Sequence, residues 1–403
     1  MPNHHPTTNR RTRVLFAAGN GDVGTTLRRW SEQASDTRIM AEAYSAQIYA
    51  LAAERGWRLF CFPNNPAPPV RHAQITTRPL PKAPARGVRF LVNEFRYGYS
   101  LAKIAQRLEA DLIIVATGMH PIGHAAIGLA RIPVIVSLHN TFWARGESPP
   151  AGLAGRILRA SAMRLNQSVR YVVAVSEEIR RQTIELWNMD PNRVAVHVPQ
   201  YRLEALPWQE RANQLPHTIL FAGRLEAYKG VDDILQGARI LEDKHPGRYR
   251  WFIAGDGPHL GNARKLAADL GIDHICDLPG QLDRSELTEH LKACYATITP
   301  TRPSFKEGLA KLPLEGAIVG RPAIVSTVVP ALDLLGDAAE PVKPSDPQDI
   351  ARAVHNLSTD PSNYKTRKAA CKIVRNLTSN SQVSFKSQIA AAADAILTPD
   401  TTG

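Results

Sequence analysis

The sequence predicts an α/β protein with two Rossmann-like domains that face each other across a deep cleft. Apolar, β-rich runs alternate with helical stretches along most of the chain, and this alternation is typical of parallel sheets covered by helices on both faces. The alternation stops between residues 201 and 216 and then restarts, which divides the pattern into two halves. At about 150 residues per domain, a chain of 403 residues suits two or three domains.

The first half, residues 13–200, is predicted to form the N-terminal domain, behind a disordered basic tail at residues 1–12 that lacks the apolar core of a secretory signal. Residues 63–84 are rich in proline, which cannot donate a backbone hydrogen bond, so a long surface loop is expected there. Buried strands are predicted at residues 13–18, 57–62, 110–117, 133–139 and 171–176, and helices at 25–55, 121–129 and 177–187.

The second half, residues 217–380, is predicted to form the C-terminal domain after a linker at residues 201–216. Residues 381–403 are expected to form an Ala-rich amphipathic helix and a tail, and this helix can pack on either domain. Strands are predicted at residues 217–222, 250–254, 275–278, 296–300 and 323–326, and helices at 230–242, 260–270 and 284–293, with a further helix ending near residue 319.

Composition excludes several classes of protein. The longest apolar stretches, residues 110–118 and 132–138, are too short to cross a bilayer. The 4 cysteines form no CxxC pair, which argues against a disulfide framework or a zinc site. We therefore expect a protein of the reducing cytoplasm that binds no structural metal.

The net charge of +12 lies entirely in the N-terminal half. Residues 1–205 hold 26 Lys and Arg against 14 Asp and Glu, whereas residues 206–403 hold 23 of each kind. A basic half favours an anionic partner, either a membrane surface or a phosphorylated substrate. Surface arginine that only aids solubility is the alternative. No RNP motif, Cys/His finger or basic zipper is present, so no nucleic-acid partner is expected.

The first glycine cluster, residues 19–24, matches GxGxxG between a strand and a helix. A NAD site also requires a carboxylate at the end of the second strand, but that strand ends in Cys61, Phe62 and Pro63. The pattern alone is a weak signal for a dinucleotide. These glycines still permit close approach of an anion to backbone amides at a helix N-terminus.

A second cluster pairs two cations around a predicted strand-to-helix turn. Arg224 follows the strand at 217–222, and Lys229 immediately precedes the next helix. Such a turn suits a diphosphate, because arginine offers a planar fork and lysine a mobile point charge. Two solvated loop cations are the alternative.

A third cluster places Glu307 in a loop and Glu315 two turns along the following helix. A rise of about 1.5 Å per residue separates the two carboxylates by roughly 12 Å at most, about the span of a sugar-diphosphate-ribose unit. The amides of residues 308–310 would face a phosphate between them. Two solvated glutamates are the alternative, but the apolar residues around them indicate a buried segment.

Together, these motifs resemble the C-terminal donor domain of the family 4 (GT-B) retaining glycosyltransferases, over residues 217–330. The N-terminal half agrees more loosely. The resemblance rests on Gly223-Arg224, Lys229-Gly230, Gly255-Asp256-Gly257-Pro258, Pro279-Gly280, the E-x7-E pair Glu307 and Glu315, and Gly320-Arg321-Pro322.

The resemblance implies a donor domain that holds a nucleoside-diphosphate sugar and an N-terminal domain that binds the acceptor. Arg224 and Lys229 would bind the donor diphosphate, together with the backbone at Gly308 and Leu309, and Gly21 would approach it from the N-terminal domain.

Two further residues are expected to take part in catalysis. The resemblance implies that Glu307 contacts hydroxyls of the donor sugar and that His139 faces the same sugar from the acceptor domain. Glu315 would bind the ribose, and Gly280 would border the base.

The implied activity is transfer of a sugar to a glycan or lipid-linked acceptor with retention of anomeric configuration. No D-x-D triplet occurs, so neither a metal nor a cofactor is expected. The basic N-terminal half favours an anionic lipid carrier or an acidic glycan as acceptor, with peripheral contact at the inner face of the cytoplasmic membrane.

Two departures from the family pattern leave the donor open. Residues 198–200 replace an Asn-Gly pair near the interdomain hinge, and residues 328–330 replace a glycine pair near the donor pocket. The alternatives are a non-catalytic nucleotide-sugar-binding scaffold, a sugar-nucleotide epimerase or phosphorylase of the same fold, and a NAD-linked oxidoreductase.

Overall fold

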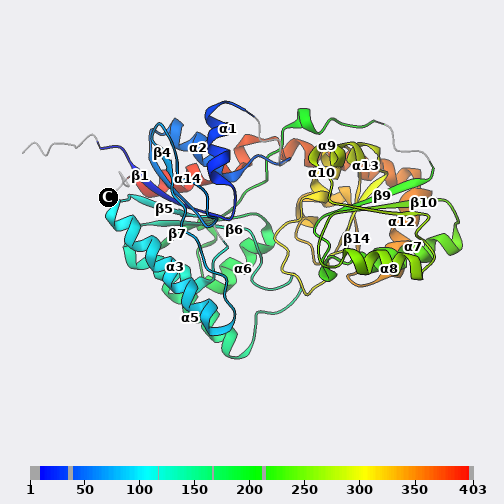
Figure 1. Cartoon of the computed structure of the whole chain (residues 1–403), viewed down its shortest axis with the longest axis horizontal. Coiled ribbons are helices and arrows are strands. Elements are labelled where there is room, and N and C mark those ends of the chain that lie inside the picture. The colour runs from blue at the N-terminus through cyan, green and yellow to red at the C-terminus, as the bar shows by residue number, and fades with distance from the viewer. Residues whose placement is uncertain (1–9, 35–39, 117, 166–167, 211–214, 399–403) are drawn as a thin grey trace, which may run out of the picture.

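The computed structural model describes residues 10–34, 40–116, 118–165, 168–210 and 215–398, and it contains two α/β domains side by side (Figure 1). The predicted disordered tail lies outside the described residues up to residue 9, and so do residues 399–403 at the C-terminus. Within the remainder of the predicted tail, Arg10 forms ion pairs with Glu109 at 2.7 Å and Asp111 at 2.8 Å.

The N-terminal sheet has the strand order β3-β4-β2-β1-β5-β6-β7-β8. Its neighbouring strands run parallel except β3 and β4, and Leu15 of β1 lies opposite Phe60 on one side and Ile113 on the other. The strands are β1 (Arg13–Gly19), β2 (Arg58–Pro63), β3 (Val70–His72), β4 (Ile75–Thr77), β5 (Leu112–Val115), β6 (Val134–Leu138), β7 (Val169–Ala174) and β8 (Val194–Val196).

Helices cover both faces of this sheet, so its central strands are buried on both sides. One layer contains α1 (Val23–Ser31), α2 (Tyr44–Glu54) and α14 (Phe385–Leu397), and the other contains α3 (Gly87–Arg107), α4 (Pro121–Ile127), α5 (Gly152–Leu165) and α6 (Glu177–Trp187).

Two details of the N-terminal domain differ from the prediction. The proline-rich segment 63–84 is not loop throughout, because it contains the antiparallel pair β3 and β4 at the edge of the sheet. An edge strand tolerates nearby prolines, whereas a central strand does not. The predicted helix 25–55 is two helices, and Gln33 adopts φ 54° just after the first one ends.

The C-terminal sheet is parallel, with the order β11-β10-β9-β12-β13-β14. Its strands are β9 (His217–Ala222), β10 (Tyr249–Ala254), β11 (Cys276–Gly280), β12 (Ala296–Thr299), β13 (Ala323–Ser326) and β14 (Ala339–Val342). Its helices are α7 (Val231–Lys244), α8 (Leu260–Asp269), α9 (Arg284–Ala293), α10 (Leu312–Ile318), α11 (Leu332–Leu335), α12 (Pro347–Thr359) and α13 (Pro361–Leu377).

Strand order determines where a ligand can sit in each domain. In the N-terminal sheet, β1 lies between β2, which follows it in the chain, and β5, which comes later. In the C-terminal sheet, β9 lies between β10 and β12 in the same way. Loops that follow such paired strands diverge and leave a crevice at the carboxyl ends of the strands. Residues 223–230 follow β9 and residues 300–311 follow β12, so the topology brings the predicted cations and Glu307 to one crevice.

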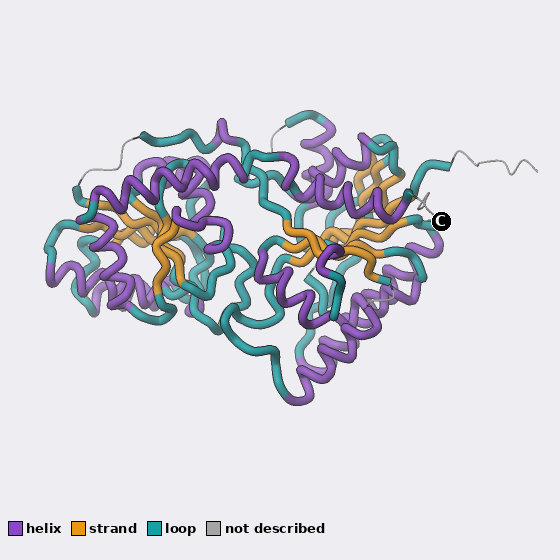
Figure 2. Tube along the Cα trace, turned by 180° about the vertical axis from the view of Figure 1, so that it is seen from behind, coloured by secondary structure: helices purple, strands orange, loops and turns teal. Residues whose placement is uncertain are grey.

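The last helix packs on the N-terminal domain, which decides between the two positions left open by the sequence. Phe385 and Ile389 of α14 are fully buried in the core beneath α1 and α2. The chain therefore crosses between the domains twice, and the two crossings lie side by side: Val198 N donates to Val383 O at 2.8 Å, and Tyr201 N donates to Thr378 O at 2.9 Å. Figure 2 shows both sheets and the segments between them from behind.

Candidate active site

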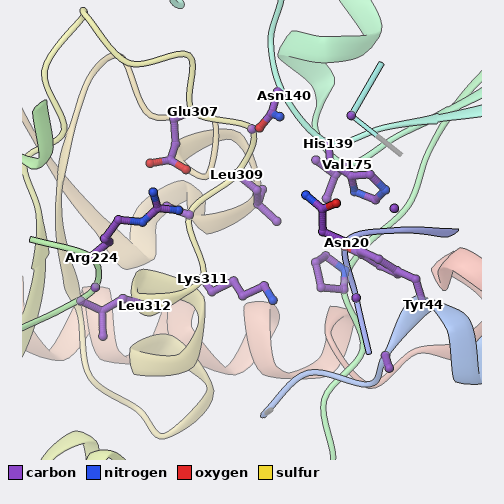
Figure 3. Close-up of a pocket in the computed structure, with 18 of the residues that line it drawn as sticks. Asn20, Tyr44, His139, Asn140, Val175, Arg224, Glu307, Leu309, Lys311 and Leu312 are labelled. Carbon is purple, nitrogen blue, oxygen red and sulfur yellow. The ribbon is translucent and has the colours of Figure 1, made fainter. Parts of the chain in front are cut away.

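A cavity of about 1000 Å³ lies between the two domains, at the carboxyl ends of both sheets. The loop at residues 19–23, Tyr44 and the segment after β6 line it on one side (Figure 3). Residues 221–229 and 305–312 line it on the other. The predicted residues in its wall are Gly21, His139, Arg224, Lys229, Glu307, Gly308, Leu309 and Glu315.

The closest polar contact in the cavity joins two of the predicted groups. Lys229 Nζ lies 2.5 Å from Glu307 Oε2, and both side chains are largely buried, at 18% and 12% exposed. Thr301 Oγ1 donates to the same carboxylate oxygen at 3.5 Å. Lys229 Nζ also lies 4.5 Å from the centre of the Phe305 ring, which stacks on Tyr228. Glu307 and Lys229 thus form a single ion pair in the wall of the donor domain.

Arg224 behaves differently from Lys229. Its side chain is 70% exposed, with Nη1 3.6 Å from Glu226 Oε1, and it extends toward the middle of the cavity (Figure 3). The turn that carries it is held by close backbone packing, because a Cβ on Gly255 would lie 1.8 Å from the carbonyl oxygen of Gly223. Only glycine permits this approach, and the φ of 137° at Gly255 also favours glycine.

The two glutamates are arranged differently from the prediction. Helix α10 begins at Leu312, so Glu315 lies in its first turn and not two turns along it. Ala310 adopts φ 69°, which is incompatible with a helix through residues 307–311. The separation of roughly 12 Å assumed such a helix and therefore loses its basis.

Glu315 is almost completely buried, with 8% of its surface exposed. Burial raises the pKa of its carboxyl group from an ordinary 4.5 to about 7, and the nearby charges of Lys311 and Arg284 and the Tyr201 hydroxyl oppose this rise. The carboxyl group therefore exchanges its proton near neutral pH.

His139 follows β6 on the acceptor side of the cavity. Burial, with a contribution from the positive charge of Lys311, lowers the pKa of the imidazole to about 4. Its Nε2 lies 3.0 Å from Ser137 Oγ, and its ring packs on Tyr44 with the ring centres 4.8 Å apart. His139 is therefore a neutral donor and acceptor of hydrogen bonds at neutral pH.

The domains touch directly where these groups meet. A Cβ on Gly308 would lie 1.8 Å from the carbonyl oxygen of His139, and Thr141 Oγ1 donates to the carbonyl oxygen of Glu307 at 3.5 Å. The loop that carries Glu307 therefore rests against the strand end that carries His139. This structure corresponds to a closed arrangement of the two domains.

The two remaining predicted glycines have different positions. Gly21 lines the cavity, and a Cβ there would meet nothing within 4 Å. Gly280 is not part of the cavity wall: it ends β11 with φ 93°, and its carbonyl oxygen accepts from Gly255 N at 2.7 Å. The structure thus keeps Gly280 out of the cavity and gives it a contact with the turn beside Arg224.

Sequence reasoning missed several polar residues that line the cavity, among them Asn20, Tyr44, Asn140 and Lys311. Lys311 extends from the donor side toward Asn20 and Tyr44, and Asn140 lies next to His139 (Figure 3). The sequence did indicate Lys311, because it is the one charged residue between Glu307 and Glu315 in an otherwise apolar segment. Nothing in the sequence pattern pointed to Tyr44, because it reaches the cavity only through the packing of α2.

Within the described residues, no group of three or more His, Cys, Asp and Glu side chains could hold a metal ion. In the same part of the chain, no helix combines the length and the apolar character required to cross a membrane.

Two protein-family models match this chain, and between them they include residues from both walls of the cavity. The model of "Glycosyl transferases group 1" matches residues 204–376, which include Arg224, Lys229 and both glutamates. The model of "Glycosyl transferase 4-like domain" matches residues 41–200, which include Tyr44 and His139. The chain belongs to the family 4 glycosyltransferases.

The curated relatives have glycosyltransferase or glycogen synthase names, and each aligns with only part of this chain. A glycogen synthase of Mycobacterium tuberculosis (strain ATCC 25618 / H37Rv) is 26% identical over 259 residues, which are 62% of this chain and 61% of that protein. A D-inositol 3-phosphate glycosyltransferase of Frankia alni is 28% identical over 280 residues, 63% of this chain and 67% of that protein. The chain thus spans about three fifths of the length of the curated relatives it matches.

Solved structures confirm the fold class. HepE of Anabaena, in complex with UDP and glucose, superimposes with a TM-score of 0.64 at 14% identity, over 96% of this chain and 100% of its own chain. Sucrose-phosphate synthase of Thermosynechococcus elongatus gives a TM-score of 0.69 at 14% identity, with 96% and 99% covered. The prediction of a GT-B fold with two Rossmann-like domains is therefore confirmed.

Proposed function

We propose that this chain transfers a sugar from a nucleoside-diphosphate sugar, bound on the C-terminal domain, to an acceptor bound on the N-terminal domain. The observation that carries the proposal is that one cavity brings the cations Arg224 and Lys229 beside the carboxyl groups of Glu307 and Glu315. The complexes of HepE with UDP and UDP-glucose support a nucleoside diphosphate as the donor group.

Arg224 and Lys229 would bind the diphosphate and stabilise the negative charge that develops on it as the bond to the sugar breaks. Arg224 is exposed and extends into the cavity, and its contact with Glu226 is a loose one of 3.6 Å, so a phosphate can reach its guanidinium from the cavity. The backbone at Gly308 and Leu309 lies in the same wall, and Gly21 faces it from the N-terminal domain. Because these two cations supply positive charge directly, we expect turnover to persist in the presence of a chelator.

Diphosphate binding would also change the state of Glu307. Lys229 holds this carboxylate at 2.5 Å, and a phosphate oxygen competes for the same ammonium group. Once Lys229 turns to the diphosphate, Glu307 becomes free to accept hydrogen bonds from hydroxyls of the donor sugar. Binding of the leaving group would thereby prepare the carboxylate that positions the sugar.

The remaining polar groups would complete the site. Neutral His139 can bond a sugar hydroxyl from the acceptor side, and the carboxyl group of Glu315 can bond the ribose hydroxyls. Retention of anomeric configuration follows from the family resemblance, with Glu307 stabilising an oxocarbenium-like transition state. Closure of the domains excludes the water that would hydrolyse the donor.

For the acceptor, we propose a glycan or a lipid-linked glycan that carries negative charge, used at the cytoplasmic face of a membrane. The charge excess of the N-terminal half and the position of Lys311, which points across the cavity toward that half, support an anionic acceptor.

A thermal-shift panel of UDP-, GDP-, ADP- and dTDP-sugars tests the donor, because a ligand of the folded state raises the melting temperature. The sugar nucleotide that stabilises the protein is then incubated with it, and release of the nucleoside diphosphate is measured. Binding without release, with or without an acceptor, would favour the non-catalytic scaffold. The absence of stabilisation by every sugar nucleotide would contradict the proposed donor class.

A further inference from the structure

Helix α3 carries an unusual surface at the outer side of the N-terminal domain, away from the cavity. Most of the exposed large apolar side chains in the described part of the chain lie on this one helix. They are Val88 at 76% exposed, Phe90 at 36%, Val92 at 48%, Phe95 at 43% and Tyr99 at 42%.

Four of these side chains form a continuous row. Val88, Val92, Phe95 and Tyr99 recur at intervals of three or four residues, so at about 100° per residue they share one face of the helix. The opposite face of α3 is buried against the domain, through residues such as Tyr97 and Leu101. The exposed row therefore lies on the side of the helix that is turned away from the core.

A row of cations runs beside the apolar row. Arg89, Arg96, Lys103 and Arg107 are all exposed and lie on the adjoining strip of the same helix. None of them forms an ion pair within the described residues. The one acidic residue of the helix, Glu94, is fully buried and pairs with Lys82, so the exposed face carries positive charge alone.

The apolar row leads into a hollow between α3, α4 and α5. This cavity has a volume of about 990 Å³, and Phe95 and the 54% exposed Leu129 both line it. Its other walls include Ile122 and Ile157, with Arg131 and Arg170. Figure 1 shows α3 and α5 together on the side of the N-terminal sheet opposite α1, α2 and α14.

We propose that the exposed face of α3 docks on an anionic lipid bilayer, with Val88, Val92, Phe95 and Tyr99 in the headgroup region and the four cations on the lipid charges. An apolar row flanked by cations suits the interface of a bilayer, which offers hydrocarbon and negative charge at the same depth. An antiparallel two-fold contact of α3 with a second copy of the chain fits less well, because it would bring the two cationic rows together. Nucleic acid would leave the apolar row unused.

Sedimentation with vesicles tests the proposal on the full chain. We expect binding to vesicles of equal parts phosphatidylcholine and phosphatidylglycerol, and little binding to phosphatidylcholine alone. Each basic residue at an anionic surface contributes roughly fivefold in affinity, so Arg89→Glu, Arg96→Glu and Lys103→Glu together should weaken binding at least about 100-fold. The double variant Val92→Ser and Phe95→Ser should weaken it about tenfold or more.

A matched variant of the other domain separates this surface from overall charge. Lys244→Glu with Lys265→Glu reverses two exposed cations on α7 and α8 and should leave vesicle binding close to that of the parent. Circular dichroism of every variant checks folding, and light scattering measures oligomeric state. Equal vesicle binding by parent and α3 variants overturns the proposal, and so does a parent dimer that the α3 variants abolish. Neither measurement needs turnover, so failure here leaves the proposed transfer reaction unaffected.

Discussion

Arg145 of the N-terminal domain places Nη2 2.5 Å from Asp333 Oδ1 of the C-terminal domain, and Nη1 donates to the carbonyl oxygen of Val329 at 3.3 Å. Both charged side chains are about one-third exposed. This ion pair bridges the domains on a side of the molecule that the main cavity does not reach, because none of the three residues lines it. It therefore stabilises the closed arrangement without touching the proposed donor.

The ion pair of Arg145 with Asp333 predicts that a substitution of Arg145 weakens closure of the two domains. A partly exposed ion pair contributes up to about 1 kcal/mol, so Arg145→Ala should lower kcat/KM by roughly two- to fivefold with little loss of stability. Small-angle X-ray scattering should show a larger radius of gyration that contracts on addition of donor. Lys265→Ala, which removes an ion pair within α8, is the control. Unchanged kinetics and scattering for Arg145→Ala would show that the bridge has no role in closure.

The pair of Lys229 and Glu307 predicts opposite effects of two substitutions on UDP binding. In Glu307→Gln, UDP no longer has to compete with a carboxylate for Lys229, so UDP should bind at least as tightly as to the parent. Turnover should fall about 100-fold or more. Lys229→Met should weaken UDP binding by roughly 10- to 100-fold. Calorimetry and a transfer assay measure the two quantities, with Glu289→Gln on α9 as a surface control. A large loss of UDP affinity in Glu307→Gln would contradict the proposed competition.

The buried carboxyl group of Glu315 predicts a pH dependence of stability. The folded state holds this proton up to about pH 7, whereas the unfolded chain releases it near its ordinary value of 4.5. Folding therefore takes up a proton between these values, and the contribution of Glu315 to the free energy of unfolding falls by about 3 kcal/mol as the pH rises through them.

The difference between the parent and Glu315→Gln isolates this contribution. Neutral His139 has the opposite effect, because its lowered pKa adds stability as the pH rises. Urea unfolding of both proteins at several pH values gives the difference between their free energies of unfolding, in which the contribution of His139 cancels. We expect Glu315→Gln to gain stability relative to the parent as the pH rises. Parallel curves for the two proteins would mean that Glu315 titrates normally.

Contact between the domains at Gly308 predicts that a single methyl group blocks closure. A Cβ there would lie 1.8 Å from the carbonyl oxygen of His139, a backbone atom that cannot move alone. Gly308→Ala should lower kcat/KM by more than about tenfold and cost about 1–3 kcal/mol at most, because opening the cleft relieves the clash. Gly261→Ala on α8 also adds one methyl group, which lies outside the cavity wall and meets nothing within 4 Å, so it should be nearly neutral. Equal activity of the two variants would refute the steric argument.

Lys311 predicts a measurable electrostatic coupling across the cavity. Its charge lowers the pKa of His139 and of Glu315, so Lys311→Met should raise both values. NMR titration of His139 detects the first change. Lys306→Met is the control, because that charge acts on the pKa of His120 and does not contribute to the shift at His139. An unchanged pKa of His139 in Lys311→Met would exclude the coupling.

Much of the fold was predictable because buried parallel strands leave continuous apolar runs and strand order determines the crevice. The turn after β9 and the loop after β12 bring Arg224, Lys229 and Glu307 into one wall for this topological reason. Local backbone geometry was harder to predict from the sequence. Because Ala310 adopts φ 69°, α10 begins only at Leu312, and Glu315 lies in its first turn.

Contacts between distant segments of the chain could not be predicted at all. Tyr44 reaches His139 within the N-terminal domain because α2 and β6 belong to the same core, and Gly308 meets His139 because the two domains touch, so neither contact has a signal in the local sequence. Gly280 shows the converse. It belongs to a motif of the family resemblance, but in the structure it supports the turn at Gly255 from outside the cavity.

The return of α14 to the N-terminal domain makes the C-terminal domain an insertion within the N-terminal one. Removing α14 would strip cover from the apolar surface that Phe385 and Ile389 occupy, so residues 13–200 alone lack part of their own core. A separately expressed acceptor domain would have to include α14, for example through a short linker after residue 200. The paired crossings at residues 198–201 and 378–383 also restrict rigid-body motion to rotation about a double-stranded pivot, which disfavours sliding of one domain along the other.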